Sequence, residues 1–483
     1  MSVLENLKPE RVFHYFEEIT KIPHGSGNTQ GISDYLADFA KEHGLRYIQD
    51  ESGNVIIFKE AAGGYENAPV VILQGHVDMV CEKLPNSTHD FTKDPLTLFV
   101  EGDMIHADGT TLGGDNGIAV AYELAILEDD KLQHPAIEAV FTVDEEIGLL
   151  GASALDTTSM KGKYLINLDS EEEGILWAGC AGGMTSISEL PVKYQERTGI
   201  CYDIKVDGLL GGHSGAEIDK IRANATLLMA RFLHEFREFG EFGLLSLNGG
   251  QKDNAIPRQA QASVLVEAED GEKLVSYAEE FTQMLRKEYT GTDEGITVTA
   301  ACKGEKSAQV LHPVSQEKVI FFLVNYPNGI QKMCGFIEGL VETSCNVGVT
   351  RLMEECLTCS ASVRSSAGSA KKALGQKIQY LTEFLGGEYH VEGDYPSWEY
   401  RQDSVLRPLM VQVYKEMFQE EPAVQVIHAG LECGLFYEKI PGLDCISIGP
   451  DMKDIHTSEE TLSISSTARV YEYLLEVLKR LKR

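Results

Sequence analysis

The sequence predicts an α/β protein with a mostly parallel, doubly wound sheet and an inserted α+β lid domain. Apolar strand-like runs alternate with helical patterns in the first third of the chain and again near its end. Between them, from about Thr185 to about Glu392, strands and helices follow each other in a different order, typical of α+β units. A chain of 483 residues is also longer than one ordinary domain.

The first expected elements are two amphipathic helices, near Glu10 to Ile22 and near Thr29 to His43, which Pro23 and Gly44 end. Strand runs then alternate with a helix. The strand runs are VIIFKE, PVVILQGHVDMV, AIEAVFTVDEE and KYLINLD, and the helix between them is GIAVAYELAIL. Near the C-terminus a further helix, SVLRPLMVQVYKEMF, precedes the strand in CISIGP. This alternation favours a parallel sheet with helices on its faces.

The middle of the chain contains two similar series of elements. The first series is CYDIKVDG, NATLLMARFLHEF, the hairpin of LLSLNGG and ASVLVEAE, KLVSYAEEFTQML and ITVTAAC. The second is EKVIFFLVNY, SCNVGVTRL, CLTCSASVRS, AKKALGQKIQYLTEFL and EYHVEG. We therefore predict two related α+β units in residues 187–395, inserted between two parts of a first domain, residues 1–186 and 396–483.

The composition argues against several classes of protein. The 42 Lys and Arg residues against 75 Asp and Glu residues give a net charge of −33, which repels nucleic acids and anionic membranes. The N-terminal residues lack an apolar secretory segment, and no run approaches the ~18 apolar residues of a membrane span. Ten scattered cysteines are typical of free thiols in a reducing compartment. We therefore expect a cytoplasmic protein without nucleic-acid or membrane partners.

Polar side chains follow the predicted parallel strands at the points where the strands end. In open α/β sheets, ligands bind beyond the carboxyl ends of the strands, so these side chains are expected to converge. The residues at the strand ends are His76, Asp78, Glu145, Glu146, Asp169 and His456, and Asp115 stands before a helix start. Asp115 alone would indicate a helix N-cap, and the Glu145–Glu146 pair alone a solvated turn. Their combination at one sheet edge favours a metal site.

Two histidines and three carboxylates suit zinc, with manganese or cobalt as substitutes. Five ligands exceed the need of one tetrahedral ion, whereas two ions that share a carboxylate would use them all. Asp78 lies two residues from His76, so on an extended segment it can orient the imidazole ring. One of the two adjacent glutamates can bind metal while the other acts as general base.

Longer motifs add a resemblance that covers nearly the whole chain. They are HDFTKDP, TLGGDNGI, NLDSEEEG, GCAGG, GGHSGAEI, NAIPR, ETSCNVGV, IHAGLECGLF and SIGP. With the ligand series, they make the sequence similar to the di-zinc metallopeptidases that include glutamate carboxypeptidase, peptidase T and carnosinase, and to the dipeptidases among them. The resemblance implies that His76, Asp115 and Asp169 bind one zinc, and that Asp115, Glu146 and His456 bind the other. It also implies that Glu145 is the general base and acid, and that Asp78 orients His76.

The inserted domain would be the lid of that family and would carry substrate-binding residues. The resemblance implies that His213 stabilises the developing oxyanion and that Arg364 holds a C-terminal carboxylate through its planar guanidinium. Asn254 would also hold the substrate, Gly430 would line the pocket, and Glu432 would help to receive the amine. Other interpretations stay open: a turn residue for His213, a strand-end cation for Arg364, and a buried structural acid for Glu432.

The activity implied is hydrolysis of dipeptides, including Xaa-His and β-Ala-His with broad specificity, by a metal-bridging water that Glu145 activates. An N-acyl amino acid deacylase or a tripeptidase would use the same chemistry, and a non-catalytic binding protein would be expected to lack a ligand or the base. Lids of the family pair between subunits. This lid looks doubled within one chain. Two arrangements therefore stay open: His213 acts within its own chain, or it acts across a homodimer.

Overall fold

The computed structural model describes residues 3–482 and separates into two compact units. Unit 1 comprises Met1–Cys180, Tyr400–Val426 and Leu431–Arg483, and unit 2 comprises Ala181–Glu399 and Ile427–Gly430. Unit 2 is therefore an insertion in the chain of unit 1. The predicted α/β class is confirmed, and the domain boundaries predicted from the sequence remain a proposal.

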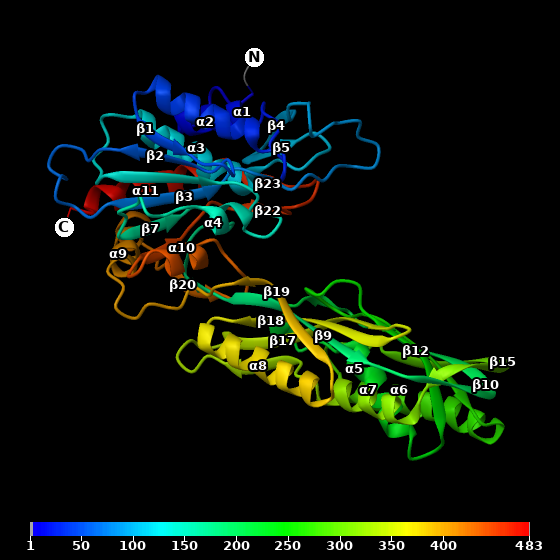
Figure 1. Ribbon diagram of the computed structural model, residues 1–483. Coiled ribbons are helices and arrows are strands. Elements are labelled where there is room, and N and C mark those ends of the chain that lie inside the picture. Colours follow the sequence, from blue (N-terminus) through cyan, green and yellow to red (C-terminus); the bar gives the residue numbers. More distant parts are fainter. Residues whose placement is uncertain (1–2, 483) are drawn as a thin grey trace. The chain divides into compact units, whose positions relative to one another are not determined.

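Unit 1 is built on an eight-stranded sheet whose centre is parallel (Figure 1). Its strands, in spatial order, are β1 (Arg46–Gln49), β2 (Val55–Lys59), β6 (Ile137–Thr142), β3 (Val71–His76), β7 (Tyr164–Asn167), β21 (Asp444–Ser447), β8 (Ile175–Cys180) and β20 (Ala423–Ile427). The neighbours β6, β3, β7 and β21 pair in parallel. The pairs β1–β2, β2–β6 and β21–β8 are antiparallel. The parallel part of the sheet is thus its four central strands.

Helices cover both faces of this sheet (Figure 1). One face carries α1 (Glu10–Ile19), α2 (Gln30–Glu42) and α3 (Gly114–Glu128), and the other carries α4 (Leu150–Ala154) and α10 (Cys433–Lys439). Helices α9 (Leu406–Phe418) and α11 (Ile464–Arg480) pack on each other and contribute to the same core. A small four-stranded sheet joins β4 (Leu98–Glu101), β5 (Met104–Ala107), β22 (Met452–Lys453) and β23 (Thr461–Ser463).

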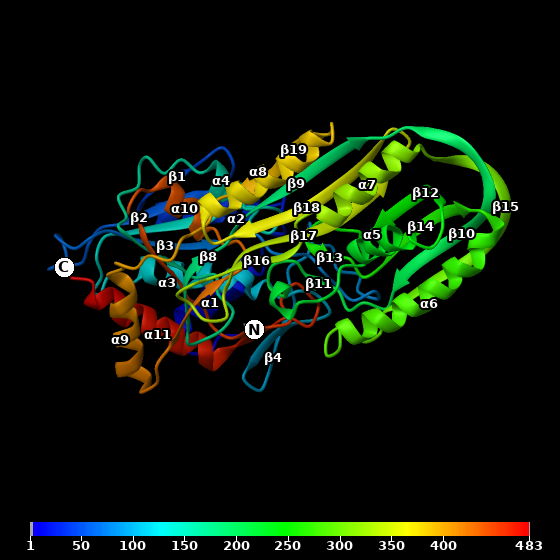
Figure 2. The same ribbon diagram turned by 90° about the horizontal axis from the view of Figure 1, so that it is seen from below.

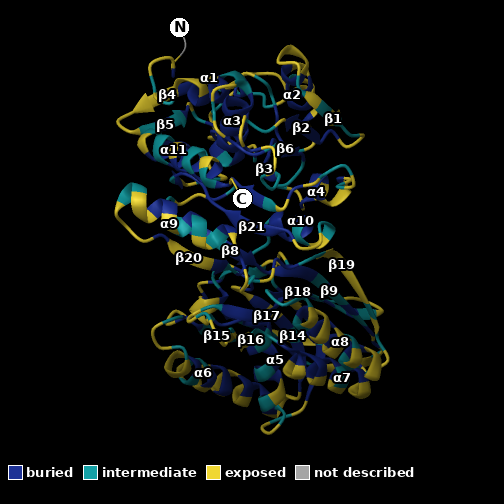
Figure 3. Cartoon of the chain, turned by 90° about the vertical axis from the view of Figure 1, so that its left-hand side faces the viewer, coloured by how far each residue is buried: buried dark blue, intermediate teal, exposed yellow. Residues whose placement is uncertain are grey.

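The central strands form because most of their residues, on both faces, are apolar. Every residue of β3 and β6 is buried, which is the pattern of strands covered by helices on both sides (Figure 3). Apolar side chains of α1 and α3 fill the space above the strands, as the near-complete burial of Phe13, Phe16 and Ile118 shows. The sheet is thus a rigid base whose strand ends can hold functional side chains in place.

Unit 2 is a long antiparallel sheet with helices on one face (Figure 2). The strands, in spatial order, are β15 (Thr297–Leu311), β10 (Tyr194–Asp207), β14 (Ala260–Val266), β12 (Phe242–Gly249), β17 (Val341–Leu352), β18 (Cys356–Ser365), β9 (Gly182–Pro191) and β19 (Glu388–Tyr395), with β16 (Gly329–Met333) paired to β17. The helices are α5 (Ala225–Phe236), α6 (Gly271–Glu288), α7 (Pro313–Asn325) and α8 (Gly368–Phe384). A short pair of strands, β11 (Gly212–His213) and β13 (Ala255–Ile256), stands apart from the sheet.

The two halves of unit 2 have the same topology. Strands β10, β12, β14 and β15 with helices α5 and α6 form one βαββαβ series, and β9, β17, β18 and β19 with α7 and α8 form the other. In each half the fourth strand pairs with the first, the first with the third, and the third with the second. The halves join where their second strands, β12 and β17, pair. The first half is inserted between β9 and α7, which is why the sequence pattern of the second half lacks its first strand.

Two further observations concern the described residues of both units. None of the ten cysteines, which all lie within residues 3–482, forms a disulfide bond. Among the described residues, no helix combines the length and the apolar character needed to cross a membrane.

Candidate metal centre and active site

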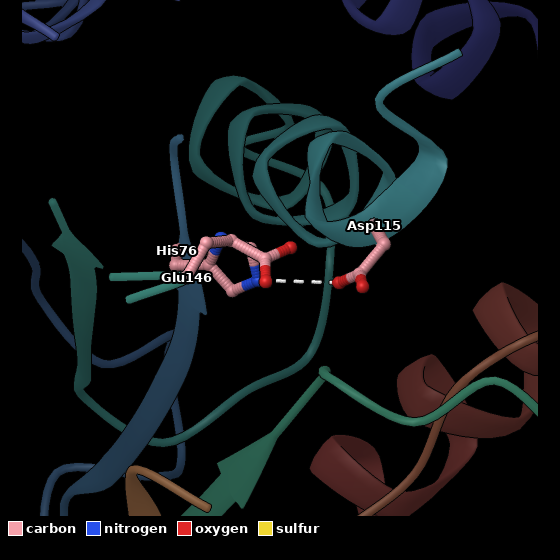
Figure 4. Close-up of side chains that lie close together, drawn as sticks. All are labelled: His76, Asp115 and Glu146. Atoms are coloured by element: carbon pink, nitrogen blue, oxygen red, sulfur yellow. Dashed lines mark hydrogen bonds and ion pairs between the residues drawn. The ribbon is translucent and has the colours of Figure 1, made fainter. Parts of the chain in front are cut away.

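The four parallel strands of unit 1 deliver the predicted ligands at one edge of the sheet. His76 is the last residue of β3, Glu146 lies in the turn after β6 and Asp169 follows β7, whereas His456 lies past β21, in the loop between β22 and β23. Because the carboxyl ends of parallel strands meet at the same edge, four chain segments distant in sequence place these side chains together. Figure 4 shows His76 and Glu146 converging on Asp115.

Asp115 lies at the start of α3, where the backbone of Asp115 and Asn116 departs from helical angles. The helix therefore presents the Asp115 carboxylate to the sheet edge instead of capping its own N-terminus. One carboxylate oxygen, Oδ1, lies 3.1 Å from His76 Nε2, and the other, Oδ2, lies 3.1 Å from His456 Nε2. Each oxygen of Asp115 thus faces a different imidazole.

The other two carboxylates divide between the same two imidazoles. Asp169 Oδ1 lies 3.3 Å from His76 Nε2, and Glu146 Oε1 lies 2.8 Å from His456 Nε2. Ligand atoms of His76, Asp115 and Glu146 also lie within 4.8 Å of one another. The five side chains therefore form two adjoining sets that share Asp115.

The carboxylates at this site have no Lys or Arg partner among the described residues. Within residues 3–482, the ion-pair partners of Asp115, Glu146 and Asp169 are the two histidines. Burial raises the pKa of Asp169 to about 7, and the carboxylates of Asp115 and Glu146 add to this rise. Hydrogen bonds with Asp115 and Glu146 raise the pKa of His456 to about 10. Crowded carboxylates beside two imidazoles are a donor set that fits divalent cations.

Glu145 lies beside this set without belonging to it. It is half-buried, and burial raises the pKa of its carboxyl group well above the usual range, with further contributions from Asp169 and Glu432. A carboxylate with a raised pKa is a stronger base, which suits it to accept and return a proton.

Comparisons with known proteins identify the family of this chain. The model of peptidase family M20/M25/M40 matches residues 72–480. The chain belongs to the M20 peptidase family. A cytosol non-specific dipeptidase of Escherichia coli (strain K12) is 35% identical over 486 residues, covering 100% of this chain and 99% of the relative. The prediction of a hydrolase of the metallopeptidase class is therefore confirmed.

Solved structures extend this comparison. The aminoacylhistidine dipeptidase of Vibrio alginolyticus superposes with a TM-score of 0.92 and 35% identity, covering 99% of this chain and 97% of that chain. A tripeptidase of Staphylococcus aureus, at 16% identity and a TM-score of 0.57, covers 99% of each chain and shares the fold.

Asp78 of this M20 peptidase contacts His76 Nδ1 through both its backbone carbonyl and its carboxylate. The nearest oxygen to His76 Nδ1 is the backbone carbonyl of Asp78, at 2.9 Å, and the Asp78 carboxylate lies 3.4 Å away. The carboxylate also accepts hydrogen bonds from Ser26 Oγ and from the backbone N–H groups of Glu145 and Glu146.

Asn116 has no role among those predicted from the sequence. Its side-chain amide donates to the backbone oxygen of Leu168 at 2.9 Å, and its Oδ1 accepts from the backbone N–H of His76 at 3.3 Å. Asn116 thus links the segments that carry His76, Asp115 and Asp169. Adjacency to Asp115 was the only sequence signal for it.

Glu432 is fully buried, with a relative exposure of 0%. Its Oε2 accepts hydrogen bonds from Thr142 Oγ1, at 2.7 Å, and from Gln74 Nε2, which stand on β6 and β3. Its Oε1 is buried without a hydrogen-bond partner. Burial raises the pKa of Glu432 to about 7. These contacts tie α10 to two central strands.

Unit 2 brings His213 and Asn254 together on the β11–β13 pair. His213 pairs with Ala255, and the backbone N–H of Ser214 donates to the carbonyl of Asn254 at 2.9 Å. His213 Nδ1 accepts hydrogen bonds from the backbone N–H groups of Gly215, at 3.3 Å, and Ala216, at 3.0 Å. A ring nitrogen that accepts carries no proton, so the proton of a neutral His213 resides on Nε2. Burial lowers the pKa of His213, and the Arg364 guanidinium lowers it further.

Arg364 and Gly430 belong to the same part of unit 2. Arg364 donates to the Tyr395 hydroxyl at 2.9 Å. A Cβ on Gly430 would lie 2.7 Å from the Tyr395 ring, so this position has no room for a side chain unless the ring shifts. A Cβ on Gly215 would lie 3.1 Å from His213 and 3.2 Å from Arg364. The four predicted substrate residues of unit 2 therefore form one cluster.

Proposed function

We propose that this M20 peptidase is a cytoplasmic dipeptidase that works with two divalent metal ions. The observation that carries the proposal is the division of five ligands into two sets around Asp115. Family membership supports peptide hydrolysis, and the relatives named as dipeptidases support the size of the substrate.

In this proposal His76, Asp169 and Asp115 would hold one ion, and His456, Glu146 and Asp115 would hold the other. The mixture of imidazole and carboxylate favours zinc, with manganese or cobalt as substitutes. Two such ions would polarise the scissile carbonyl and lower the pKa of a water molecule. Asp78 and Asn116 keep the ligand segments in place through the hydrogen bonds described above.

Glu145 is the proposed general base and acid. Its raised pKa favours taking a proton from the attacking water, and the same carboxyl group returns that proton to the leaving amine. Glu145 is free for this role because its neighbour Glu146 contacts His456.

Unit 2 is the proposed lid. His213 would donate its Nε2 proton to the developing oxyanion, because Nδ1 is occupied as an acceptor. Arg364 would bind the C-terminal carboxylate, and Asn254 and Gly430 would line the same site. Glu432 has two candidate roles, reception of the substrate amine and attachment of α10 to the sheet. Its hydrogen bonds to Gln74 and Thr142 favour the second.

We further propose Xaa-His dipeptides, including β-Ala-His, as substrates within a broad specificity. The relative from Vibrio alginolyticus, named as an aminoacylhistidine dipeptidase, supports the histidine preference. The second candidate is an N-acyl amino acid deacylase or a tripeptidase with the same metal chemistry, and the tripeptidase with the same fold motivates its inclusion. A homodimer is compatible with the doubled lid, and sedimentation of the metal-loaded chain measures the oligomeric state.

The test is metal-dependent hydrolysis of Ala-His and β-Ala-His. Protein stripped by a chelator is titrated with zinc or manganese while the bound metal per chain is counted. We expect activity to return as the metal content approaches two ions per chain. Binding of two ions without cleavage of either dipeptide, but with cleavage of N-acetylated amino acids or tripeptides, would support the second candidate. Binding of one ion at full activity would contradict the two-ion site.

A further inference from the structure

Glu460 is a buried carboxylate that holds the loop in front of Asp115. It has a relative exposure of 3%. Its Oε2 accepts hydrogen bonds from the backbone N–H groups of Leu112, at 2.8 Å, and Gly113, at 3.1 Å. Its Oε1 accepts from Gly114, at 2.8 Å, and from Asp115 itself, at 3.3 Å. Four consecutive backbone donors are thus satisfied by one side chain.

The sequence of the loop makes this contact possible. Gly113 has a φ of 69°, in the left-handed region that favours glycine. A Cβ on Gly114 would lie 3.3 Å from Glu460 Oε1 and 3.2 Å from Met452 Sδ, closer than most side chains allow. The glycine pair therefore lets the backbone approach the carboxylate closely enough for all four hydrogen bonds.

Glu460 also belongs to the segment that carries a second ligand. His456 is four residues earlier in the same loop, and its Nε2 faces Asp115 Oδ2 at 3.1 Å. The segment of residues 456–460 therefore contacts the segment of residues 112–115 twice. His456 faces the Asp115 carboxylate, and Glu460 accepts hydrogen bonds from the backbone. A charged acceptor of N–H donors makes stronger hydrogen bonds than a neutral one, so the connection depends on the carboxylate.

We propose that Glu460 is a positioning residue for the metal centre, which fixes the carboxylate of Asp115 relative to His456 before any ion binds. This inference rests on the proposed function, because it assigns Glu460 to the two-ion site. Glu460 acts through the backbone of residues 112–115 and not by contact with the reacting atoms. Loss of the Glu460 carboxylate leaves backbone donors unsatisfied. The loop can then move and carry Asp115 away from its position between His76 and His456.

The experiment compares Glu460→Gln with Glu459→Gln, which makes the same change of charge at the exposed neighbouring residue. Metal affinity is measured by competition with a chromophoric chelator, and the absorption spectrum of the cobalt-loaded protein reports the ligand geometry. Outer groups that orient metal ligands commonly change affinity about 10–100-fold. We expect Glu460→Gln to weaken binding of at least one ion by about tenfold or more and to change the cobalt spectrum. Glu459→Gln should leave both unchanged.

A second variant, Gly114→Ala, keeps Glu460 and pushes the loop away from it, and it replaces Glu460→Gln if that protein does not fold. We expect the same loss of affinity. Unchanged affinity and an unchanged cobalt spectrum in a folded variant, even with a lower melting temperature, would overturn the proposal and leave Glu460 a role in stability alone. A wild-type protein that fails to bind two ions would instead refute the proposed function, so the two failures are distinguishable.

Discussion

The carboxylate of Asp78 accepts a hydrogen bond from the backbone N–H of Glu145 at 3.0 Å. The same carboxylate accepts from Glu146 N, at 3.3 Å, and from Ser26 Oγ, at 2.8 Å. Asp78 also follows His76 by two residues and lies against its ring. One buried side chain therefore connects the end of β3 to the turn after β6, and so the candidate ligand His76 to the proposed general base Glu145.

Replacement of Asp78 by Asn is expected to weaken metal binding and turnover together. Asn has one acceptor oxygen where the carboxylate has two, so at least one of the N–H groups of Glu145 and Glu146 loses its partner. We expect metal affinity to fall about 10–100-fold, as for other groups that orient metal ligands. Chelator competition measures the affinity. Ser26→Ala, which removes a single donor to Asp78, is the matched control and should have a smaller effect. Equal affinities of wild type and Asp78→Asn would contradict this role.

Replacement of Glu145 by Gln is expected to remove turnover while the bound metal stays at the wild-type level. The amide keeps the size of the side chain but cannot accept the proton from water. Loss of a general base commonly lowers the rate ~10²–10⁴-fold. Steady-state hydrolysis of Ala-His and the metal content per chain are measured on the same sample. Glu51→Gln, an exposed residue remote in sequence, serves as the control. A Glu145→Gln protein with near-normal kcat would show that another group is the base.

Replacement of His213 by Ala is expected to lower kcat more than it raises KM. The donor on Nε2 would act on the oxyanion, which develops in the transition state and is absent from the bound substrate, and loss of one such donor costs ~10²–10³-fold. Kinetics at several dipeptide concentrations separate the two constants. His390→Ala, at an exposed position on β19, is the control in unit 2. If kcat were retained and only KM rose, His213 would bind the ground state instead.

Acid is expected to destabilise the protein partly through His428. Burial, followed by the nearby Arg364 guanidinium, lowers the pKa of His428 to about 4 from 6.5. Its Nε2 lies 2.7 Å from Ser344 Oγ, and Asp219 acts weakly in the opposite direction. Because the unfolded chain binds the proton first, stability is complete above pH 6.5 and is lost as the pH falls toward 4. The loss attributable to this residue is about 3 kcal/mol.

The measurement is the free energy of unfolding of wild type and His428→Gln between pH 4 and pH 7. The substitution removes the titrating group, so the difference between the two proteins should shrink or reverse as the pH falls. A constant difference across this range would mean that His428 does not titrate within it. Reversibility of unfolding is checked first, because two units need not unfold in one transition.

Much of the candidate site could be predicted from local patterns. Strands β3, β6, β7 and β21 are apolar runs that end in polar residues, and the geometry of a parallel sheet places the ends of such strands at one edge. The strand patterns alone therefore indicated which polar side chains would lie close together at this edge of the sheet. The two α+β series of unit 2 were also recognisable, because periods of two and of 3.6 residues are local properties.

Only the tertiary structure decided which polar groups hold those ligands in place. Glu460 meets the backbone of Leu112 across a separation of 348 residues, and Asn116 bonds to Leu168 across 52. Strand β9 completes the second half of unit 2 although the whole first half lies between it and α7. A hydrogen bond between distant segments leaves no period in either segment, because it depends on the path of the folded backbone. The sequence by itself thus determined the elements and the polar side chains at their ends, and the packing determined the buried acceptors that fix these side chains.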